Sequence, residues 1–335
     1  MDIIQITKDY CTWDKVLQLL IQQDHEHHYF STLGLTVPQQ HKYLLSKIMN
    51  RMEKLTDRNM LFAIQKNNEF LVLFGVDFNT FHSEIFNRTI IEIGPVYVSK
   101  ESVIEEIAEP ISRIIQECMD CTDPYFKVKL DSTNTMAIEI FNTIGFTYST
   151  SAVKMLFNPQ RYSSKFQQHF ELKSKYAEND YYVRRIQFTD FKIQLNNLIE
   201  QHRKSIHYLM YKNDFEESKV QELFTEWFQL HNQKKQTILL GLFSRRNQLI
   251  GFTCCNGPIN IHTASVYTRD VTIIDQPFKG KGLAGLLYKE LHSTTNTFIE
   301  GNPLSDNYRN IQLNLNCGYS IVHSRVYFKM NTRSS

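Results

Sequence analysis

The segment Lys279-Gly280-Lys281-Gly282-Leu283-Ala284-Gly285 places three glycines between a strand-like stretch and a helix-like stretch. Residues 267–275 before it are rich in apolar and β-branched side chains, and residues 283–292 have the apolar spacing of an amphipathic helix. A glycine-rich turn from a strand into a helix points several backbone N–H groups outward at the positive end of the helix dipole. The segment therefore predicts a site for a pyrophosphate group.

The same segment also fits the pattern Gly-x-Gly-x-x-Gly of dinucleotide-binding βαβ folds, in which Glu300 would be the acid that binds a ribose. Against that interpretation, four residues separate the strand from Gly280, and only 50 residues (286–335) follow Gly285. These are too few for the further βαβ units of such a fold. A third interpretation is that the glycines only permit a tight turn.

Two segments of the chain align without a gap at an offset of 173 residues (134 to 307). The first runs from Asn134 to Phe146 and the second from Asn307 to Tyr319. Each begins with an asparagine that can cap an amphipathic helix, and each ends in a glycine that suits a left-handed helix stop. Strand-like residues follow both segments, at 152–157 and 320–330. This similarity predicts a duplicated fold.

The elements upstream of these two segments also match in order. In the first half we expect strands at 3–6, 60–64, 70–78 and 90–98. In the second half we expect strands at 181–186, 237–243, 249–254, 267–275 and 297–300, with helices near 190–209 and 214–230. The sequence thus predicts an α+β protein with one domain at 1–158, a polar linker at 159–179 and a second domain at 180–335.

The two halves differ in their glycines. Residues 1–158 contain four glycines and residues 159–335 contain eight. In the first half the turn that corresponds to the glycine cluster is Val98-Ser-Lys-Glu-Ser-Val-Ile104, and a side chain at every position would obstruct a close approach of phosphate to the backbone. We therefore expect one competent phosphate site and one degenerate copy.

Residues 279–284 resemble motif A of the GNAT acetyltransferase superfamily, usually written Gln/Arg-x-x-Gly-x-Gly/Ala, with Lys279 in place of the first Gln or Arg. The Asn307–Tyr319 segment resembles motif B of the same superfamily, and Asn134–Phe146 matches its common form more closely. The resemblance covers nearly the whole chain and implies two tandem GNAT folds, each a mixed, mostly antiparallel sheet flanked by helices. The layout is similar to that of mycothiol synthase.

The resemblance implies acetyl-CoA as the cofactor. The backbone of Thr272, Ile273 and Ile274 would pair with the pantetheine amides and offer an N–H group to the thioester oxygen. The pyrophosphate-binding residues implied by the resemblance are Lys279, Gly280, Lys281, Gly282, Leu283, Ala284 and Gly285. Asn307 and Asn314 of motif B would complete the cofactor site.

Asp270 and Glu300 are the candidate catalytic bases. Asp270 lies in an apolar strand, where desolvation raises the pKa of a carboxyl group toward a useful range, and strand periodicity places it on one face with Thr268. The alternative is that Asp270 pairs with a neighbouring cation such as Arg269 or Lys281. Glu300 ends the next strand and is the second candidate.

The chain departs from the family pattern at Asn314. Many GNAT enzymes have there a tyrosine that protonates the CoA sulfur, and the corresponding residue of the first half is Phe141. Asparagine cannot act as an acid, but it can donate a hydrogen bond to the sulfur or to a pantetheine carbonyl. An unassisted thiolate is also a tolerable leaving group, since thiol pKa values lie near 8.5.

These observations favour an acetyl-CoA-dependent N-acetyltransferase that acts on a primary amine of a small molecule or protein, with its chemistry in the second domain. Two alternatives are a Fem-type transferase that uses aminoacyl-tRNA and a non-catalytic CoA sensor or interaction protein. The near-neutral charge of the chain and its intact glycine cluster argue against the Fem type.

Charge and composition narrow the partners. The formal net charge is +2, which indicates neither a nucleic acid nor an acidic membrane as partner. The N-terminus resembles no signal peptide and no stretch is long and apolar enough to span a bilayer, so we expect a cytoplasmic protein. The pair Cys118 and Cys121 and the cluster Asp24–His28 lack the spacing of zinc sites, and we expect no metal.

Overall fold

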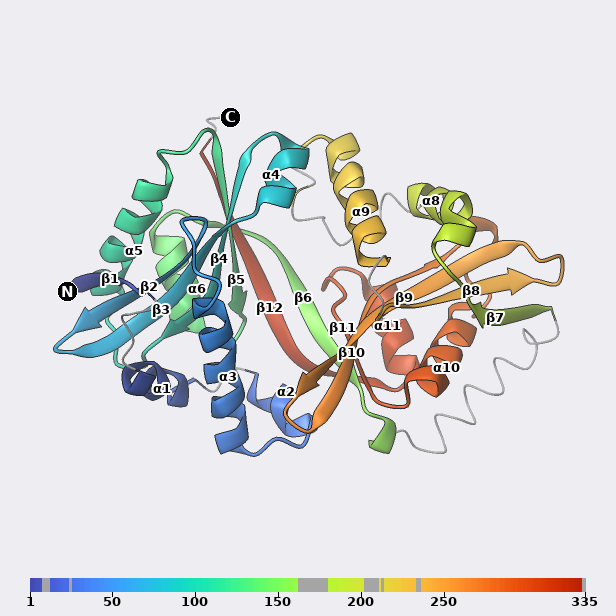
Figure 1. Cartoon of the computed structure of the whole chain (residues 1–335), viewed down its shortest axis with the longest axis horizontal. Coiled ribbons are helices and arrows are strands. Elements are labelled where there is room, and N and C mark those ends of the chain that lie inside the picture. The colour runs from blue at the N-terminus through green and yellow to red at the C-terminus, as the bar shows by residue number, and fades with distance from the viewer. Residues whose placement is uncertain are drawn as a thin grey trace. The chain divides into compact units, whose positions relative to one another are not determined.

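The computed structural model describes residues 1–7, 13–23, 26–161, 180–201, 211, 214–232 and 236–332 (Figure 1). The chain divides into two compact units. Unit 1 comprises residues 1–31, 35–151 and 324–335, and unit 2 comprises residues 32–34 and 152–323. Most of the expected linker and the end of the expected helix at 190–209 lie outside the described residues.

Unit 1 is built around a sheet with the strand order β1-β2-β3-β4-β5-β12. All neighbours in this sheet are antiparallel except β4 and β5, which are parallel. The elements are β1 (Asp2–Gln5), α1 (Trp13–Ile21), α2 (His27–Thr32), α3 (Val37–Met52), β2 (Asn59–Lys66), β3 (Glu69–Phe78), α4 (Thr80–Phe86), β4 (Thr89–Val98), α5 (Ile104–Cys118), β5 (Pro124–Asp131), α6 (Thr135–Thr143) and β6 (Thr147–Phe157).

Unit 2 has the corresponding sheet, in the order β6-β11-β10-β9-β8-β7, and again one neighbouring pair, β10 and β11, is parallel. The elements are β7 (Tyr181–Arg185), α8 (Lys192–Gln201), α9 (Glu217–Asn232), β8 (Ile238–Ser244), β9 (Leu249–Ile261), β10 (Ala264–Ile274), α10 (Ala284–Thr295), β11 (Phe298–Gly301), α11 (Tyr308–Asn316) and β12 (Tyr319–Asn331).

The last strand of each half contributes to both units. Residues 325–331 of β12 pair with β5 in unit 1, and residues 155–157 of β6 pair with β11 in unit 2. The sequence places the boundary after residue 158, whereas the contacts assign residues 152–157 to unit 2 and residues 324–335 to unit 1. Strand pairing is non-local, so an apolar strand pattern predicts that a strand exists but does not predict its partner.

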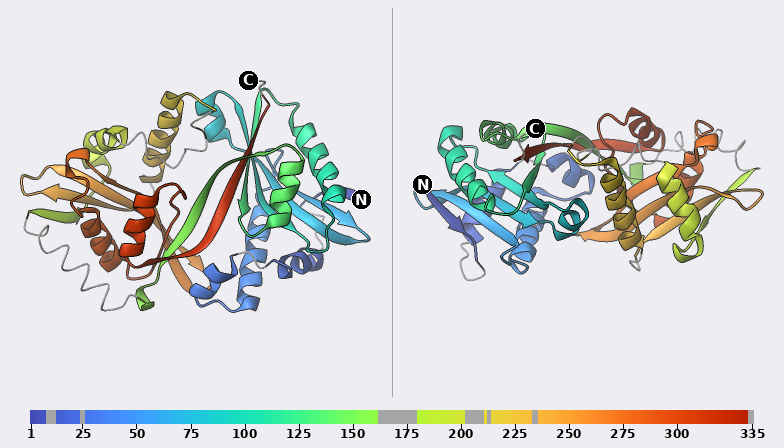
Figure 2. Two further views of the ribbon diagram at one scale, coloured as in Figure 1. Left: turned by 180° about the vertical axis from the view of Figure 1, so that it is seen from behind. Right: turned by 90° about the horizontal axis from the view of Figure 1, so that it is seen from above.

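Helices cover the sheets on apolar faces. In unit 1, α5 and α6 pack on one face of the sheet through a core that includes Ile111, Ile140 and Phe126 (Figure 2). In unit 2, Leu287 of α10 belongs to the core on one face, and Phe228 of α9 belongs to the core on the other. The predicted α+β fold with mostly antiparallel sheets flanked by helices is confirmed.

The helix caps of the duplicated segments are also as predicted. The side chain of Asn134 accepts a hydrogen bond from the backbone N–H of Ala137 at 3.1 Å, and that of Asn307 accepts one from Asn310 at 3.2 Å. Gly145 and Gly318 have φ angles of 98° and 86°, the left-handed conformation expected after a helix. The same local signals therefore position α6 and α11.

Candidate cofactor-binding site

The glycine turn before α10 exposes a row of backbone donors. Gly280 and Gly282 have φ angles of 80° and 74°, which side-chain-bearing residues adopt only with strain. The backbone N–H groups of Gly280, Lys281, Gly282, Leu283 and Ala284 make no hydrogen bond to any group in the described part of the chain. They lie at the N-terminus of α10, a helix of 12 residues that begins at Ala284, so the helix dipole adds to their attraction for an anion. We call residues 280–284 the cradle.

The cradle opens into a cavity of about 840 Å³ within unit 2. Its lining comprises Phe224 of α9 and residues from three segments, which are 269–274 of β10, the turn at 278–284 and 302–313, which lead into and form α11. Of the residues predicted from sequence, those that line the cavity are Asp270, Thr272, Ile273, Ile274, Lys279, Gly280, Gly282, Leu283, Ala284 and Asn307. Lys281, Gly285, Glu300 and Asn314 are not among the lining residues.

Strand β10 presents an unpaired backbone edge to this cavity. Its pairing with β11 ends at Arg269 and Gly301, although β10 continues to Ile274. The backbone N–H of Asp275 donates to Ile250 on the β9 side, and alternate residues of a strand direct their backbone groups to opposite sides. The backbone N–H and C=O groups of Thr272 and Ile274 therefore point away from β9, toward the space that β11 leaves open.

Basic side chains lie around the cradle. Lys279 and Arg309 both line the cavity and are exposed. Partial burial lowers the pKa of Lys279, the Arg309 guanidinium lowers it further, and Asp275 opposes both. Two cations close enough to repel each other are a suitable environment for a ligand with several negative charges.

Asp270 is held at a β-bulge in β10. Arg269 pairs with Cys255 and Val271 with Cys254, so Asp270 has no partner in β9. Its carboxylate accepts a hydrogen bond from the Nδ2 of Asn256, and the Oδ1 of Asn256 accepts one from Thr237 at 2.7 Å. The expected alternative partners do not pair with it, because Arg269 binds other groups and Lys281 lies over the Phe278 ring. Asp270 thus reaches the cavity from an orienting network.

Glu300, the second candidate base, lies in a different setting. Its side chain is 14% exposed, forms an ion pair with Lys154 at 3.6 Å and accepts a hydrogen bond from Asn302 at 2.8 Å. It does not line the cavity. This geometry fits a carboxylate with a structural role in β11.

Asn314 is fully buried within α11. Its Nδ2 donates to the backbone oxygen and to the Oδ1 of Asn310, at 2.7 and 2.8 Å. Its Oδ1 accepts hydrogen bonds from Arg269 at 2.7 Å and from the Tyr288 hydroxyl at 3.2 Å. Both donor hydrogens are therefore in use inside the protein, and Asn314 lies behind the cavity wall.

The sequence alone did not identify Arg269 as part of this site. Its guanidinium lies 4.7 Å from the Tyr288 ring centroid and donates to the Thr272 hydroxyl at 3.2 Å. Strict strand alternation would place Arg269 and Thr272 on opposite faces, but the bulge at Asp270 brings them to the same face. No feature of the sequence marks that bulge.

Comparison with solved structures identifies this architecture. No protein-family model and no curated protein matches the sequence. A GCN5-related N-acetyltransferase from Sphaerobacter thermophilus matches with a TM-score of 0.63 at 10% identity, over 99% of this chain and 96% of that one. A tandem GNAT protein from the clavulanic acid biosynthesis pathway matches with a TM-score of 0.55 at 10% identity, over 100% and 99% of the two chains. The fold is the tandem GNAT fold.

A third match is the GCN5-related glucosamine N-acetyltransferase region of a fungal multi-domain GH3 β-N-acetylglucosaminidase. Its TM-score is 0.59 at 10% identity, over 98% of this chain and 38% of that one. Identities this low show the fold alone.

In the first GNAT unit, side chains form hydrogen bonds with the backbone of the corresponding turn at residues 98–104. The Oε1 of Gln22 accepts hydrogen bonds from the Ser99 hydroxyl at 2.8 Å and from the backbone N–H of Lys100 at 3.3 Å. The backbone N–H of Glu101 donates to the Ser99 hydroxyl at 3.3 Å, and Gln23 caps the carbonyl of Val98 at 3.0 Å. Donors that are available in the cradle of unit 2 are thus bonded internally in unit 1.

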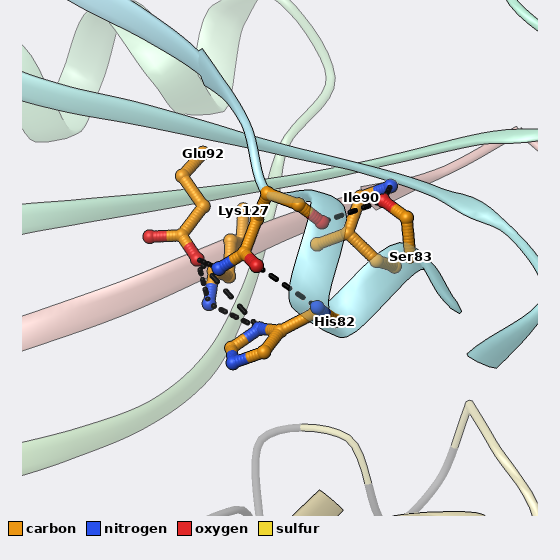
Figure 3. Close-up of polar contacts among 6 residues, drawn as sticks. His82, Ser83, Ile90, Glu92 and Lys127 are labelled. Carbon is orange, nitrogen blue, oxygen red and sulfur yellow. Dashed lines mark hydrogen bonds and ion pairs between the residues drawn. The ribbon is translucent and has the colours of Figure 1, made fainter. Parts of the chain in front are cut away.

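The first GNAT unit instead holds a polar cluster between α4 and the parallel strands β4 and β5 (Figure 3). Lys127 forms an ion pair with Glu92 at 2.7 Å, and the His82 ring lies 3.4 Å from Lys127 and 3.7 Å from Glu92. Burial and the Lys127 ammonium lower the pKa of His82 to about 4. Burial alone would raise the pKa of Glu92, but Lys127 and the Asn79 amide hold it below its ordinary value. This mutually satisfied cluster stabilises the strand pair.

Two further predictions concern metals and membranes. Among the described residues no group of His, Cys, Asp or Glu side chains could hold a metal ion, and Asp24 and His25 lie outside them. Within the same residues, no helix is long and apolar enough to cross a membrane.

Proposed function

We propose that this chain is an acetyl-CoA-dependent N-acetyltransferase whose cofactor site and chemistry lie in unit 2. The observation that carries the proposal is the cradle, whose five backbone N–H groups have no partner in the described part of the chain and precede α10. Such a set of donors suits the pyrophosphate of CoA.

The residues along the cavity fit the rest of the cofactor. The backbone groups of Thr272 and Ile274 would bind the amides of the pantetheine arm in the manner of an added strand. Lys279 and Arg309 would bind phosphate oxygens, since both line the cavity beside the cradle. Bound in this way, acetyl-CoA supplies a thioester as the source of the acetyl group.

Asp270 is the residue of this chain that would accept a proton from the attacking amine, directly or through water. It lines the cavity, and its hydrogen bond from Asn256 fixes the direction of the carboxylate. The acceptor must be a neutral amine when it attacks, and the substrate class of this proposal is a primary amine of a small molecule or protein. Glu300 is a weaker candidate because it does not line the cavity.

Calorimetry with acetyl-CoA tests the proposal on the wild type and on Gly282→Glu. The variant places a carboxylate beside the pyrophosphate and strains a residue with φ of 74°. Hydrogen bonds to charged groups contribute about 1.5–3 kcal/mol each, so the loss of two predicts at least about 100-fold weaker binding. Gly34→Glu is the matched control, since Gly34 has φ of 82°, is exposed and does not line the cavity.

Wild-type protein that does not bind acetyl-CoA would overturn the proposal, as would equal binding by Gly282→Glu and Gly34→Glu. An amine panel with detection of free thiol then separates catalysis from sensing. Binding without CoA release for any amine would favour a CoA-sensing protein.

A further inference from the structure

Arg269 is a buried cation without a buried anion beside it. The residue is 4% exposed, and no carboxylate of the described residues lies within ion-pair distance of it. Its Nε atom has no hydrogen-bond partner among those residues. The groups of the described residues that contact it are neutral, namely the amide of Asn314, the hydroxyl of Thr272 and the rings of Tyr288 and Tyr319. An unpaired buried charge is costly, so its retention indicates a use other than stability.

Arg269 lies at the cavity, and a chain of hydrogen bonds joins it to a second lining residue, Asn310. Arg269 donates to the Oδ1 of Asn314 at 2.7 Å, and the Nδ2 of Asn314 donates to the Oδ1 of Asn310 at 2.8 Å. The two amides are thus aligned head to tail, and each bond polarises the next. The positive end of this chain is the Nδ2 group of Asn310.

Asn310 lines the cavity, and its Nδ2 has no partner among the described residues. The cradle lies beyond the C-terminal end of β10, whereas Arg269 lies five residues before Ile274, or roughly 16 Å along a strand. A CoA arm bound from the cradle along Thr272 and Ile274 would therefore bring its sulfur toward the end of the cavity where Arg269 and Asn310 lie.

The first GNAT unit serves as an internal comparison. At the offset of 173 residues, Asn310 corresponds to Ala137 and Asn314 to Phe141. Gly301, which pairs with Arg269, corresponds to Val128, which pairs with Ile93. All three counterparts are buried apolar residues of the core, namely Ile93, Ala137 and Phe141. The hydrogen-bonded polar residues therefore occur in the unit that has the cradle, and apolar residues replace them in the unit that lacks it.

We infer that Asn310 donates a hydrogen bond to the departing CoA sulfur and that Arg269 polarises Asn310 through Asn314. The inference rests on the proposed function. In the transfer, the amine nitrogen bonds to the acetyl carbon, the C–S bond breaks with its electron pair on sulfur, and the amine proton passes to Asp270 or water. A donor aimed at the sulfur stabilises the thiolate without giving up a proton, as a site without a general acid requires. Of these three residues, Asn310 is a catalytic residue, and Arg269 and Asn314 are positioning residues.

The titratable groups around the hydrogen-bonded residues Arg269, Asn314 and Asn310 do not themselves titrate near neutral pH. Burial raises the pKa values of Tyr288 on α10, Tyr319 on β12 and Cys255 on β9, and raises that of Cys317 to about 12. Burial and Arg269 lower the pKa of His292 on α10 to about 3. Asp270, Lys279, Asp306 and Arg309 also face the cavity, so the test needs a ligand that differs from CoA only at sulfur.

The test compares CoA with desulfo-CoA, which lacks the sulfur atom, by calorimetry from pH 6 to pH 9. Stabilisation of the bound thiolate lowers the pKa of the CoA thiol on binding. The ratio of CoA affinity to desulfo-CoA affinity therefore rises with pH, and it levels off above the pKa of the free thiol. A charge-assisted hydrogen bond predicts a rise of at least about tenfold. Ultraviolet absorbance of the thiolate provides a second readout of the same pKa.

Three variants and one control variant assign the effect to the hydrogen bonds that join Arg269, Asn314 and Asn310. Asn310→Ala should abolish the rise and leave desulfo-CoA affinity within about threefold of wild type. Arg269→Met should reduce the rise, Arg269→Lys should restore part of it, and Asn316→Ala, an exposed position of α11, should change nothing. Tight CoA binding with no rise in the wild type, or an unchanged rise in Asn310→Ala, would overturn the inference and leave the proposed function intact. No binding of either ligand would overturn both.

Discussion

Replacement of His292 by phenylalanine should make unit 2 more resistant to acid. The His292 ring stacks on Phe157 with centroids 3.7 Å apart and planes 10° apart, a geometry that a phenyl ring can keep. Burial, with a further contribution from Arg269, lowers the pKa of the imidazole from 6.5 to about 3. Folding therefore requires the neutral ring.

The sign and size of the effect follow from proton linkage. Between pH 6.5 and pH 3 the unfolded state binds the proton and the folded state does not, so the free energy of unfolding falls as pH falls. With these two pKa values, the loss between pH 8 and pH 5 is about 2 kcal/mol. The contribution is fully present above pH 6.5, and His292→Phe should remove this loss.

Urea unfolding at pH 8 and pH 5 measures the effect. In a Trp13→Phe background, Trp227 of α9 is the one tryptophan left and reports on unit 2. Carboxylates titrate equally in both proteins, so their effect cancels in the comparison. His82→Phe is the control, because His82 belongs to unit 1 and should not change the unit 2 transition. An equal loss of stability in wild type and His292→Phe would refute the reasoning.

Two other substitutions test the proposed base and the turn of unit 1. Asp270→Asn should retain acetyl-CoA affinity within about threefold but lower kcat by roughly 100-fold or more. It should also remove the acidic limb of the pH–rate profile, because that limb reports protonation of the base, and steady-state kinetics would show both changes. Unchanged kinetics would exclude Asp270 as base. Gln22→Ala should destabilise unit 1 by about 1–3 kcal/mol, because the Ser99 hydroxyl and the Lys100 N–H lose their acceptor. Denaturant unfolding would show this, and altered acetyl-CoA affinity in that variant would contradict a role confined to unit 1.

Local signals allowed much of the fold to be predicted from the sequence. The caps at Asn134 and Asn307 and the stops at Gly145 and Gly318 determine two helices through contacts within a few residues. The same holds for the turn at 280–284, whose glycines adopt the left-handed conformation that the pattern requires. Signals of this kind depend on neighbouring residues alone, and the sequence displays them directly.

The features that the sequence did not reveal depend on distant pairings. A bulge at Asp270 moves Arg269 onto the face of Thr272, and this shift becomes visible only in the register with β9. Asn310 looks like an ordinary residue of an amphipathic helix until Arg269 and Asn314 are found behind it. The contribution of residues 152–157 to unit 2 likewise depends on β11 as partner.

Hydrogen–deuterium exchange with and without acetyl-CoA tests the central claim most directly, because it observes the backbone N–H groups of both turns in one experiment. The account predicts that acetyl-CoA slows exchange in a peptide covering residues 278–286 and leaves a peptide covering residues 98–104 unchanged. Protection at 98–104, or no protection at 278–286 at saturating acetyl-CoA, would contradict it.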